Sequence, residues 1–293
     1  MPDIDFANLR NTRAHNPGAI ASALASRTRR DMLGSDGKLM IIAADHPARA
    51  AMGIGKDAMA MANREVLIEK LATALENPGV DGVLATPDII DDLALLGLLD
   101  NKIVVGSMNR GGLRGASFEM DDRFGAYTIQ SLVESRLDFA KTLTRINFQD
   151  AGTANTLMAT ANAVNDAVAA KLPIMLEPFI SEWKDGKIEN QLTPDAVIHS
   201  IAIVAALGVS SAYTWLKIPY VDDMERVMES TTLPTLILGG DRGGDTESLY
   251  SEWKHAVSLP GVRGLVVGRS LLYPTSGSVT DAIAGAVDIV HGG

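Results

Sequence analysis

The feature that most constrains the fold is a short apolar segment followed by a loop and a helical segment, a unit that recurs along the chain. Eight such apolar segments have continuously aliphatic interiors, which is typical of parallel strands buried on both faces. They span residues 38–47, 80–88, 101–110, 141–150, 172–180, 212–220, 233–241 and 262–270. Eight strands that alternate with helices predict an α/β fold, the (β/α)8 TIM barrel. The alternative is a doubly wound open sheet, which rarely needs eight parallel strands.

Segments with the apolar period of a helix lie between the strands. The clearest span residues 62–77, 127–140, 154–170, 193–208 and 221–231, and residues 278–291 are expected to form the last outer helix. Because these segments follow strands, they are expected to cover the outside of the barrel.

The region before Lys38 lies outside this repeat. Residues 18–33 predict one extra helix, which we expect to close the lower end of the barrel. No linker or low-complexity segment divides the chain. We therefore expect a single barrel domain over residues 1–293, in which residues 1–37 form an N-terminal helical extension.

Charge and composition narrow the classes of function. A formal net charge of −10 provides no basic field to collect a nucleic-acid backbone. No apolar run approaches the ~18 residues of a membrane-spanning helix, and the polar N-terminus does not resemble a signal peptide. We therefore expect a cytoplasmic enzyme that acts on a small molecule, without a nucleic-acid or membrane partner.

Several kinds of catalytic centre lack the residues that they need. The chain has no cysteine, which excludes disulfides, thiolate metal sites and cysteine nucleophiles. Its five histidines are far apart in sequence, without His-x-His or HExxH spacing. The GxSxG pattern of a nucleophilic serine is also absent. We expect neither a metal nor another cofactor.

Charged residues near the carboxyl ends of the predicted strands are the candidate catalytic groups, because TIM barrels build their active sites there. Asp45 ends the first strand, Glu177 lies near the end of the fifth and Lys217 near the end of the sixth. Asp45 taken alone would rather cap a turn or a helix, and Glu177 could form an ion pair with Arg145 or Lys217. Lys217 is either paired with a carboxylate or has a pKa lowered by burial, which would leave a neutral amine able to attack a carbonyl.

The fourth predicted strand carries Arg145 and Asn147. Being two residues apart, they point to the same side, while Ile146 and Phe148 point to the other. Since Ile146 and Phe148 suit packing against outer helices, we expect Arg145 and Asn147 to face the barrel lumen. A polar network without a chemical role is the alternative interpretation for this pair.

Glycines and an arginine follow the last two strands. The seventh ends at Gly239 and Gly240, and the eighth is followed by Gly268 and Arg269. Backbone amides after these two strands often bind phosphate in TIM barrels, and an arginine adds a charge-assisted contact. We therefore expect a phosphate site here.

A long glycine-rich loop follows the third strand. Residues 106–127 include Arg110 and Arg114, and loops of this length on a compact barrel are usually functional. We expect this loop to act as a lid whose arginines contact the substrate; a subunit contact is the alternative.

The chain resembles the class I, Schiff-base aldolases of the DeoC/LacD/DhnA type. The matching stretches are IIAADHP at 41–47, LEP at 176–178, WLKIP at 215–219, LGGD at 238–241 and VVGRS at 266–270. The resemblance covers nearly the full length, and the order of the stretches is more specific than any one of them. GSMNRGG at 106–112 and DDRF at 121–124 look most like an actinobacterial-type subgroup that is sometimes found with inositol-catabolism genes.

The resemblance implies a role for each candidate residue. Lys217 would be the Schiff-base lysine, Asp45 the first-strand carboxylate and Glu177 the fifth-strand acid and base. Gly239, Gly240, Gly268 and Arg269 would hold a substrate phosphate. Several relatives carry a lysine on the fourth strand and others a tyrosine. Here Arg145 and Asn147 are the candidates, and Lys141 is set aside because it comes too early in the strand.

These residues lead to the hypothesis of a lyase that reversibly cleaves a phosphorylated ketose or keto-sugar acid and releases dihydroxyacetone phosphate. Candidate substrates are 2-deoxy-5-keto-gluconate 6-phosphate, fructose 1,6-bisphosphate and a sulfosugar phosphate. Arg145 would keep Lys217 deprotonated by like-charge repulsion or bind an oxyanion. The alternatives are a transaldolase- or thiolase-like transferase and a non-catalytic barrel that binds sugar phosphates. Because barrels of this type commonly self-associate, we expect a homo-oligomer.

Overall fold

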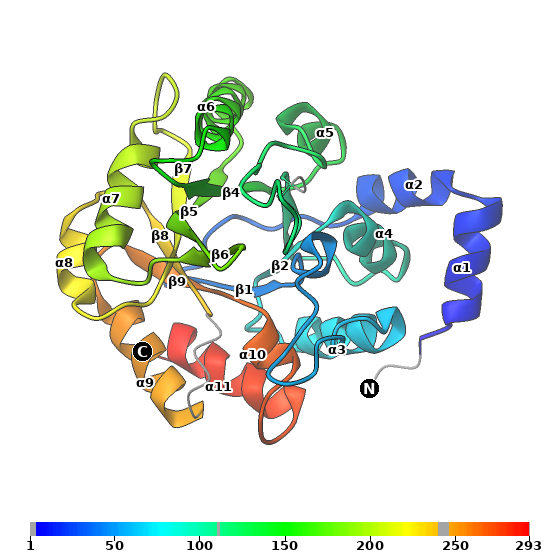
Figure 1. Cartoon of the computed structure of the whole chain (residues 1–293). Helices are drawn as coiled ribbons and strands as arrows, with labels where there is room; N and C mark the ends of the chain where they lie inside the picture. The colour runs from blue at the N-terminus through cyan, green and yellow to red at the C-terminus, as the bar shows by residue number, and fades with distance from the viewer. Residues whose placement is uncertain (1–3, 110–111, 240–245, 293) are drawn as a thin grey trace.

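A computed structural model describes residues 4–109, 112–239 and 246–292 as a barrel of parallel strands surrounded by helices (Figure 1). The strands are β1 (Leu39–Ala43), β2 (Gly82–Ala85), β3 (Ile103–Ser107), β4 (Phe139–Ile146), β5 (Ile174–Lys184), β6 (Lys187–Asn190), β7 (Thr214–Pro219), β8 (Thr235–Leu238) and β9 (Val262–Val267). Their order in the sheet is β4-β3-β2-β1-β9-β8-β7-β5, and the pairing of β4 with β5 closes it. Eight parallel strands thus form the predicted TIM barrel.

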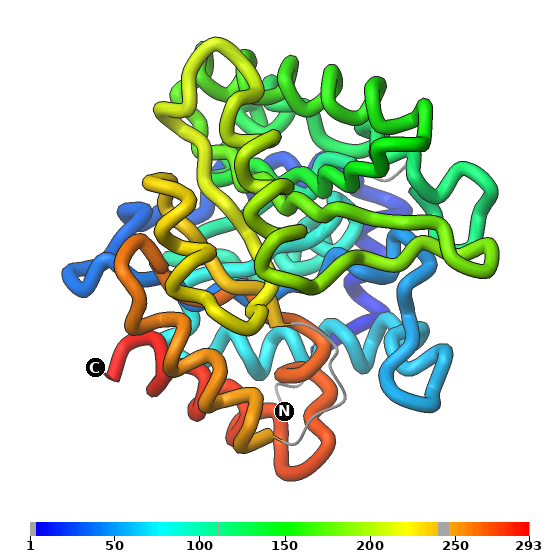
Figure 2. Tube along the Cα trace, turned by 60° about the vertical axis from the view of Figure 1, so that its left-hand side comes forward, coloured from blue at the N-terminus to red at the C-terminus, as the bar shows by residue number. Residues whose placement is uncertain are grey.

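The helices cover the outside of this barrel. They are α1 (Phe6–His15), α2 (Gly18–Ser26), α3 (Arg64–Glu76), α4 (Pro87–Leu95), α5 (Ile129–Glu134), α6 (Gly152–Ala170), α7 (Pro194–Ala205), α8 (Met224–Glu229), α9 (Thr246–Ser258), α10 (Arg269–Leu272) and α11 (Val279–His291), with a short 3-10 helix η1 (Pro47–Arg49). In Figure 2 the red C-terminal α11 runs beside the orange α9, and the two helices pack together. None of the described helices has the length and apolarity required to span a bilayer.

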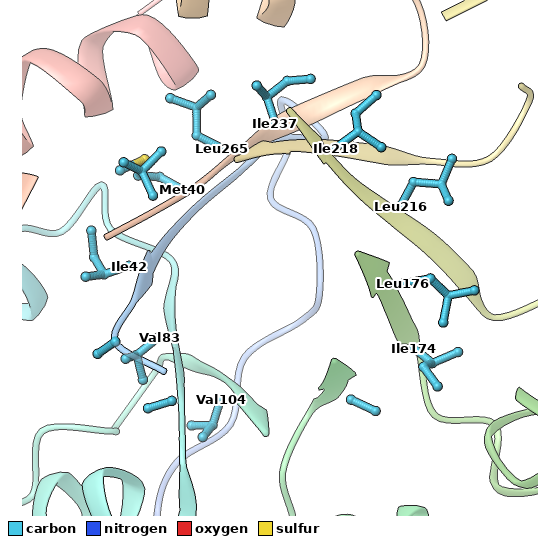
Figure 3. Packing of buried hydrophobic residues seen from close by; sticks show 14 of the residues in the cluster. Met40, Ile42, Val83, Val104, Ile174, Leu176, Leu216, Ile218, Ile237 and Leu265 are labelled. Carbon is cyan, nitrogen blue, oxygen red and sulfur yellow. The ribbon is translucent and has the colours of Figure 1, made fainter. Parts of the chain in front are cut away.

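Alternation along each strand divides the core into two parts. On β1, Met40 and Ile42 point outward to the helices, and Val83, Leu216 and Ile237 do the same on other strands (Figure 3). The lumen is filled by side chains of the opposite parity, which make a separate apolar cluster: Leu39, Ile41, Ala43, Leu84, Ile103, Val105, Phe139, Met175, Leu236 and Val266. This cluster forms an apolar floor that separates the charged side chains above it from the lower end of the barrel.

The lower end of the barrel differs from the prediction of a single closing helix. Two helices, α1 and α2, form the N-terminal extension, and α2 packs against α4 on the outside. The segment after α2 closes the barrel instead. Arg27 and Arg29 pair with Asp138, just before β4, and Met32 packs against the lumen cluster. An extended segment can reach under the strands, whereas a helix of 10–12 Å diameter fits better on the outer surface.

Two further boundaries differ from the predictions. The helix expected over residues 127–140 is only α5, because Arg136 adopts a left-handed φ of 56° and ends it. As a result β4 begins at Phe139. The fifth strand continues past the barrel and pairs antiparallel with β6, forming a hairpin over Ser181–Asn190 that the sequence analysis did not predict.

Candidate active site

Four charged side chains lie directly above the apolar floor of the barrel. Lys141 comes from β4, Glu177 from β5 and Lys217 from β7, while Asp45 follows β1 by two residues. Every second residue of a strand faces inward. Each of the four charged residues lies an even number of positions from an inward-facing residue of the same strand, so it also faces the lumen. All four residues are at most 9% exposed, so their charges must be compensated by one another.

The side chains of Asp45, Lys141, Glu177 and Lys217 form a charged layer, and Glu177 is at its centre. Its Oε1 lies 2.8 Å from Lys217 Nζ, and its Oε2 is ion-paired with Lys141 Nζ. Lys141 Nζ also lies 3.1 Å from Asp45 Oδ2, which accepts a hydrogen bond of 3.0 Å from Ser107 Oγ. One carboxylate therefore bridges two buried lysines, and a second carboxylate balances the extra positive charge.

The layer shifts the acid–base properties of its members. Burial lowers the pKa of Lys217 from its usual value near 10.5, and the charge of Lys141 adds to this, although Glu177 and Asp45 oppose it. Burial alone would raise the pKa of Glu177, but the charges of Lys141 and Lys217 outweigh it and lower that pKa to about 2. The layer thus combines an ionised carboxylate with a lysine that loses its proton more readily than usual.

His46 lies beside this layer, with its Nδ1 3.8 Å from Asp45 Oδ1. Burial, followed by the charges of Arg269 and Lys217, lowers the pKa of His46 to about 3, although Asp45 opposes this shift. The imidazole is therefore neutral near pH 7. Among the described residues, no group of three or more His, Asp or Glu side chains is arranged to hold a metal ion.

A cavity of about 350 Å³ opens above the charged layer. One side is cationic, since Arg49 follows β1, Arg114 lies in the loop after β3 and Arg269 follows β9. The opposite side is mainly apolar, although Asn190 and Glu252 also line it. Its apolar residues come from β5, β6, β8, α9 and the loops after β6 and β7: Phe179, Ile188, Leu192, Tyr220, Leu238 and Leu249. Such a cavity suits a small polar molecule that carries an anionic group at one end.

Comparison with known proteins places the chain in a family. A profile of the Cgl0159-like family matches residues 37–287. The chain belongs to the Cgl0159-like family. A crystal structure of Cgl0159 from Corynebacterium glutamicum (Brevibacterium flavum) is 60% identical to it, with a TM-score of 0.97 over 100% of this chain and 99% of that one. No curated protein matches the sequence.

More distant solved structures share the fold. An archaeal fructose 1,6-bisphosphate aldolase is 18% identical, with a TM-score of 0.68 over 94% of this chain and 100% of that one. A further solved structure of an archaeal fructose-1,6-bisphosphate aldolase, in which the catalytic lysine is covalently bound to the carbinolamine intermediate of the substrate, is 19% identical. Its TM-score is 0.63 over 92% of this chain and 99% of that one. The fold of this Cgl0159-like protein therefore resembles that of Schiff-base, class I aldolases.

The structure brings together three of the five residues that the sequence analysis named as catalytic. Lys217, Asp45 and Glu177 meet in the charged layer. Arg145 faces the lumen as expected and lines the cavity, yet its guanidinium is ion-paired with Glu119 and Asp122 from the loop after β3. The expectation that the charge of Arg145 keeps Lys217 deprotonated is therefore wrong, because the neighbouring cation that lowers the pKa of Lys217 is Lys141.

Asn147 lies elsewhere in this Cgl0159-like protein, which corrects its predicted inward orientation. β4 ends at Ile146, so the alternation of sides stops before Asn147. Its Oδ1 accepts a hydrogen bond of 2.9 Å from Gln149 N, which stabilises the turn toward α6. The neighbouring Phe148 is 74% exposed and does not pack against outer helices as predicted.

Lys141 was not predicted to be catalytic, although its position in the strand indicated that it faces inward. Lys141 is four residues before Arg145 on the same strand, so the expected inward orientation of Arg145 implied that Lys141 also faces inward. It was set aside because its Cα lies four residues, roughly 13 Å, below that of Arg145. A lysine side chain is long enough to extend upward from there, and Lys141 reaches Glu177, which lies two residues beyond its register partner Met175.

The predicted phosphate residues are only partly described. Gly239, Gly268, Arg269 and Arg114 line the cavity, whereas Gly240 and Arg110 lie outside the described residues. The two described glycines also serve strand packing, because a Cβ at Gly268 would lie 2.0 Å from Ala43 O and one at Gly239 2.4 Å from Val267 Cγ1. A glycine at these positions is thus required by packing alone and is weak evidence for phosphate binding.

Proposed function

We propose that this Cgl0159-like protein is a class I aldolase, a lyase that cleaves a phosphorylated ketose or keto-sugar acid through a Schiff base on Lys217. The observation that carries the proposal is the Glu177 carboxylate bridging Lys141 and Lys217 at the base of the cavity. The charge of the second lysine helps to keep Lys217 in its nucleophilic, neutral form.

The reaction begins with attack of the Lys217 Nζ lone pair on the substrate ketone. The amine passes one proton to the oxygen to give a neutral carbinolamine, a neighbouring acid then protonates the hydroxyl so that it leaves as water, and a protonated imine forms. This imine accepts the electron pair of the breaking carbon–carbon bond, which a ketone cannot do readily at neutral pH. The aldehyde product leaves, the enamine takes a proton on carbon, and water releases the ketone product from Lys217.

Two carboxylates are positioned for the proton transfers of this sequence. Glu177 contacts Lys217 directly, and Asp45 is held by Lys141 and Ser107. Either carboxylate can take the proton from the hydroxyl whose oxygen becomes that of the aldehyde, because both lie in the charged layer. Lys141 then stabilises the negative charge that develops on oxygen, the role first expected of Arg145.

The cationic side of the cavity favours a substrate that carries phosphate. Arg269, Arg49 and Arg114, with the backbone at Gly239 and Gly268, would bind this group. Its binding energy would position the reacting carbons against Lys217. The released ketone would then be dihydroxyacetone phosphate. The candidate substrates are 2-deoxy-5-keto-gluconate 6-phosphate, fructose 1,6-bisphosphate and a sulfosugar phosphate.

Reduction with borohydride in the presence of dihydroxyacetone phosphate, followed by peptide mass spectrometry, tests the proposal. We expect one adduct, on Lys217, and loss of labelling in Lys217→Met. Lys38→Met is a matched control: burial also lowers the pKa of Lys38, but its Nζ donates to Val257 O and Val262 O far from the cavity. Absence of an adduct on Lys217 would contradict the Schiff base and favour a non-catalytic sugar-phosphate-binding barrel.

A second measurement separates cleavage from group transfer. Incubation of each candidate substrate alone is expected to release dihydroxyacetone phosphate together with an aldehyde. Product formation that requires an added acceptor would instead favour a transaldolase- or thiolase-like transferase.

A further inference from the structure

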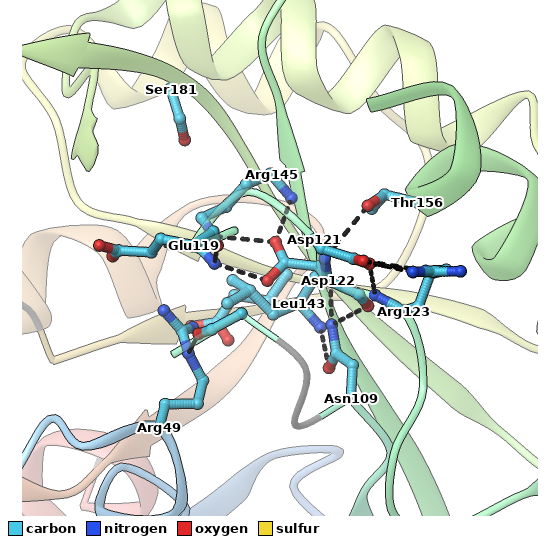
Figure 4. Close-up of polar contacts among 12 residues, drawn as sticks. Arg49, Asn109, Glu119, Asp121, Asp122, Arg123, Leu143, Arg145, Thr156 and Ser181 are labelled. Atoms are coloured by element: carbon cyan, nitrogen blue, oxygen red, sulfur yellow. Dashed lines mark hydrogen bonds and ion pairs between the residues drawn. The ribbon is translucent and has the colours of Figure 1, made fainter. Parts of the chain in front are cut away.

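Arg145 is held by several charge-assisted hydrogen bonds beside the cavity, and both of its anionic partners come from the loop after β3 (Figure 4). Its Nε and Nη2 donate to Asp122 Oδ2 and Oδ1 at 2.8 and 2.7 Å. Its Nη1 lies 3.3 Å from Glu119 Oε1, and its Nη2 also donates to Glu119 O. The side chains of all three residues are at most 6% exposed, so this ion-paired group, the Arg145 cluster, is shielded from solvent.

The backbone of the loop approaches the Arg145 cluster closely at Gly112. A Cβ on Gly112 would lie 2.4 Å from Arg145 Nη2 and 2.7 Å from Asp122 Oδ1. Any larger residue would therefore push the loop away from the cluster. The Arg145 cluster and the glycine together hold the segment 112–122 against β4.

Two short links connect the Arg145 cluster to the cationic side of the cavity. Glu119 Oε2 accepts a hydrogen bond of 2.7 Å from Gly115 N, which adjoins Arg114. On the other side, Gly112 O accepts a hydrogen bond of 3.2 Å from Arg49 Nε. Arg114 N also donates to Arg49 O at 3.0 Å, which joins the two links. Arg49, Arg114 and Glu119 line the cavity, and Gly112 reaches Arg49 from the cluster side.

We propose that Arg145 is a positioning residue that acts through Glu119 and Gly112 to hold Arg49 and Arg114 where they bind an anionic group of the substrate. Only the identity of the substrate in this proposal rests on the proposed function. The positioning role itself can be tested separately, because anion binding can be measured without turnover. It replaces the direct role on Lys217 that the sequence had indicated for Arg145.

The physical reason for this arrangement is preorganisation. The segment 112–122 contains no helix and no ladder of strand pairing, so its order depends on side-chain contacts. Without the Arg145 cluster, binding an anion would first have to order the segment, which reduces affinity. An arginine suits this position because its planar fork bonds one carboxylate with two nitrogens and still reaches a second.

The proposal is tested with four variants: Arg145→Met, Arg114→Met, the double variant of both, and Gly112→Ala. Gly112→Ala keeps every charge and disturbs only the contact with the cluster, so it serves if Arg145→Met folds poorly. Arg27→Met is the matched control, since Arg27 is equally buried and pairs with Asp138 at 2.7 Å at the opposite end of the barrel.

Two readouts are needed, one with an anion and one without. The first is the dissociation constant of inorganic phosphate from titration calorimetry. The second is the concentration of neutral dihydroxyacetone at which borohydride traps half of the maximal amount of adduct on Lys217. We expect Arg145→Met, Gly112→Ala and Arg114→Met each to weaken phosphate binding about tenfold or more. The loss in the double variant should be smaller than the product of its two single losses, because Arg145 acts partly through Arg114. The value for dihydroxyacetone should change less than about twofold.

The outcomes separate this proposal from the proposed function. Unchanged phosphate binding in Arg145→Met and Gly112→Ala, or losses that multiply in the double variant, would overturn the positioning role. So would weakened phosphate binding in Arg27→Met, because that result would indicate a general effect of lost stability. If the phosphate results are as expected but dihydroxyacetone forms no adduct with the wild type, the positioning role stands and the aldolase proposal fails.

Discussion

At the scale of single residues, the central feature is that Glu177 is shared by two lysines. A buried carboxylate with one lysine would mainly stabilise the ammonium form of that lysine. The second lysine changes the balance, because Lys141 also pairs with Glu177 and with Asp45. Lys217 therefore receives only part of the compensation from Glu177, and burial lowers its pKa.

This arrangement predicts opposite pH shifts for two substitutions. Lys141→Met removes a positive charge that lowers the pKa of Lys217, so that pKa should rise. Glu177→Gln removes a negative charge that raises it, so the pKa should fall. Because only neutral Lys217 attacks the ketone, the half-maximal pH of adduct formation should increase in the first variant and decrease in the second. A close charge changes a pKa by about one unit or more.

The pH at which the rate of borohydride trapping with dihydroxyacetone reaches half its maximum measures this shift. Lys102→Met is the control, since Lys102 Nζ donates to Val80 O at 2.6 Å below the barrel and should leave the half-maximal pH unchanged. Shifts of the same sign in Lys141→Met and Glu177→Gln would show that the direct charges do not control the pKa of Lys217.

At the scale of secondary-structure elements, the β5–β6 hairpin is the addition to the barrel that most affects the cavity. β5 pairs with β4 over Ile174 to Ile180, and its pairing with β6 begins at Ser181. Ile188 of the hairpin lines the apolar side of the cavity. The hairpin is joined to the turn after β4 by a hydrogen bond of 2.6 Å from Trp183 Nε1 to Asp150 Oδ2.

Removing the hairpin should therefore affect the substrate more than the fold. Ser181 and Asn190 are register partners, so an Asn-Gly turn can replace residues 182–189 without moving the chain ends. We expect the melting temperature to fall by only a few degrees, because the barrel pairing is retained. The KM of the cleaved phosphosugar should rise about tenfold or more through loss of apolar contact area, corresponding to about 1.4 kcal/mol.

Circular dichroism melts and steady-state kinetics measure the two effects. The adduct of Lys217 with dihydroxyacetone is the internal control and should persist in the shortened chain. Unfolding of this variant would show that the hairpin is part of the barrel core, and an unchanged KM would exclude its contact with substrate.

At the scale of the whole molecule, stability and chemistry are separated between the two ends of the barrel. The lower end is held by aspartates that precede strands, and Asp138 is the clearest case. It accepts hydrogen bonds of 2.7 Å from Arg27 and Arg29 and of 2.9 Å from Val104 N. These contacts connect the N-terminal extension to β3 and β4 and are remote from Lys217.

Asp138→Asn should accordingly destabilise the protein without altering its chemistry. Breaking a buried ion pair on one side leaves an uncompensated charge on Arg27, which costs about 3–5 kcal/mol. Denaturant unfolding should show this loss of free energy, while kcat and KM at 25 °C stay within about twofold of the wild type. A large change in KM would show that the two ends of the barrel are coupled.

The sequence by itself determined the barrel and most of its charged layer. Strand parity is a local property of the backbone, so the apolar pattern alone placed Asp45, Glu177 and Lys217 at one end of the lumen. Boundaries were less well predicted, because a single residue such as Arg136 in a left-handed conformation can end a helix.

Only the tertiary structure decided which of these charges meet. The partners of Arg145 lie 23 and 26 residues away in a loop without periodicity, and they turn a candidate catalytic group into an anchor for that loop. Lys141 enters the layer because its side chain extends upward to Glu177. Side-chain reach and loop path depend on the packing of separate elements, so no local pattern in the chain contains them.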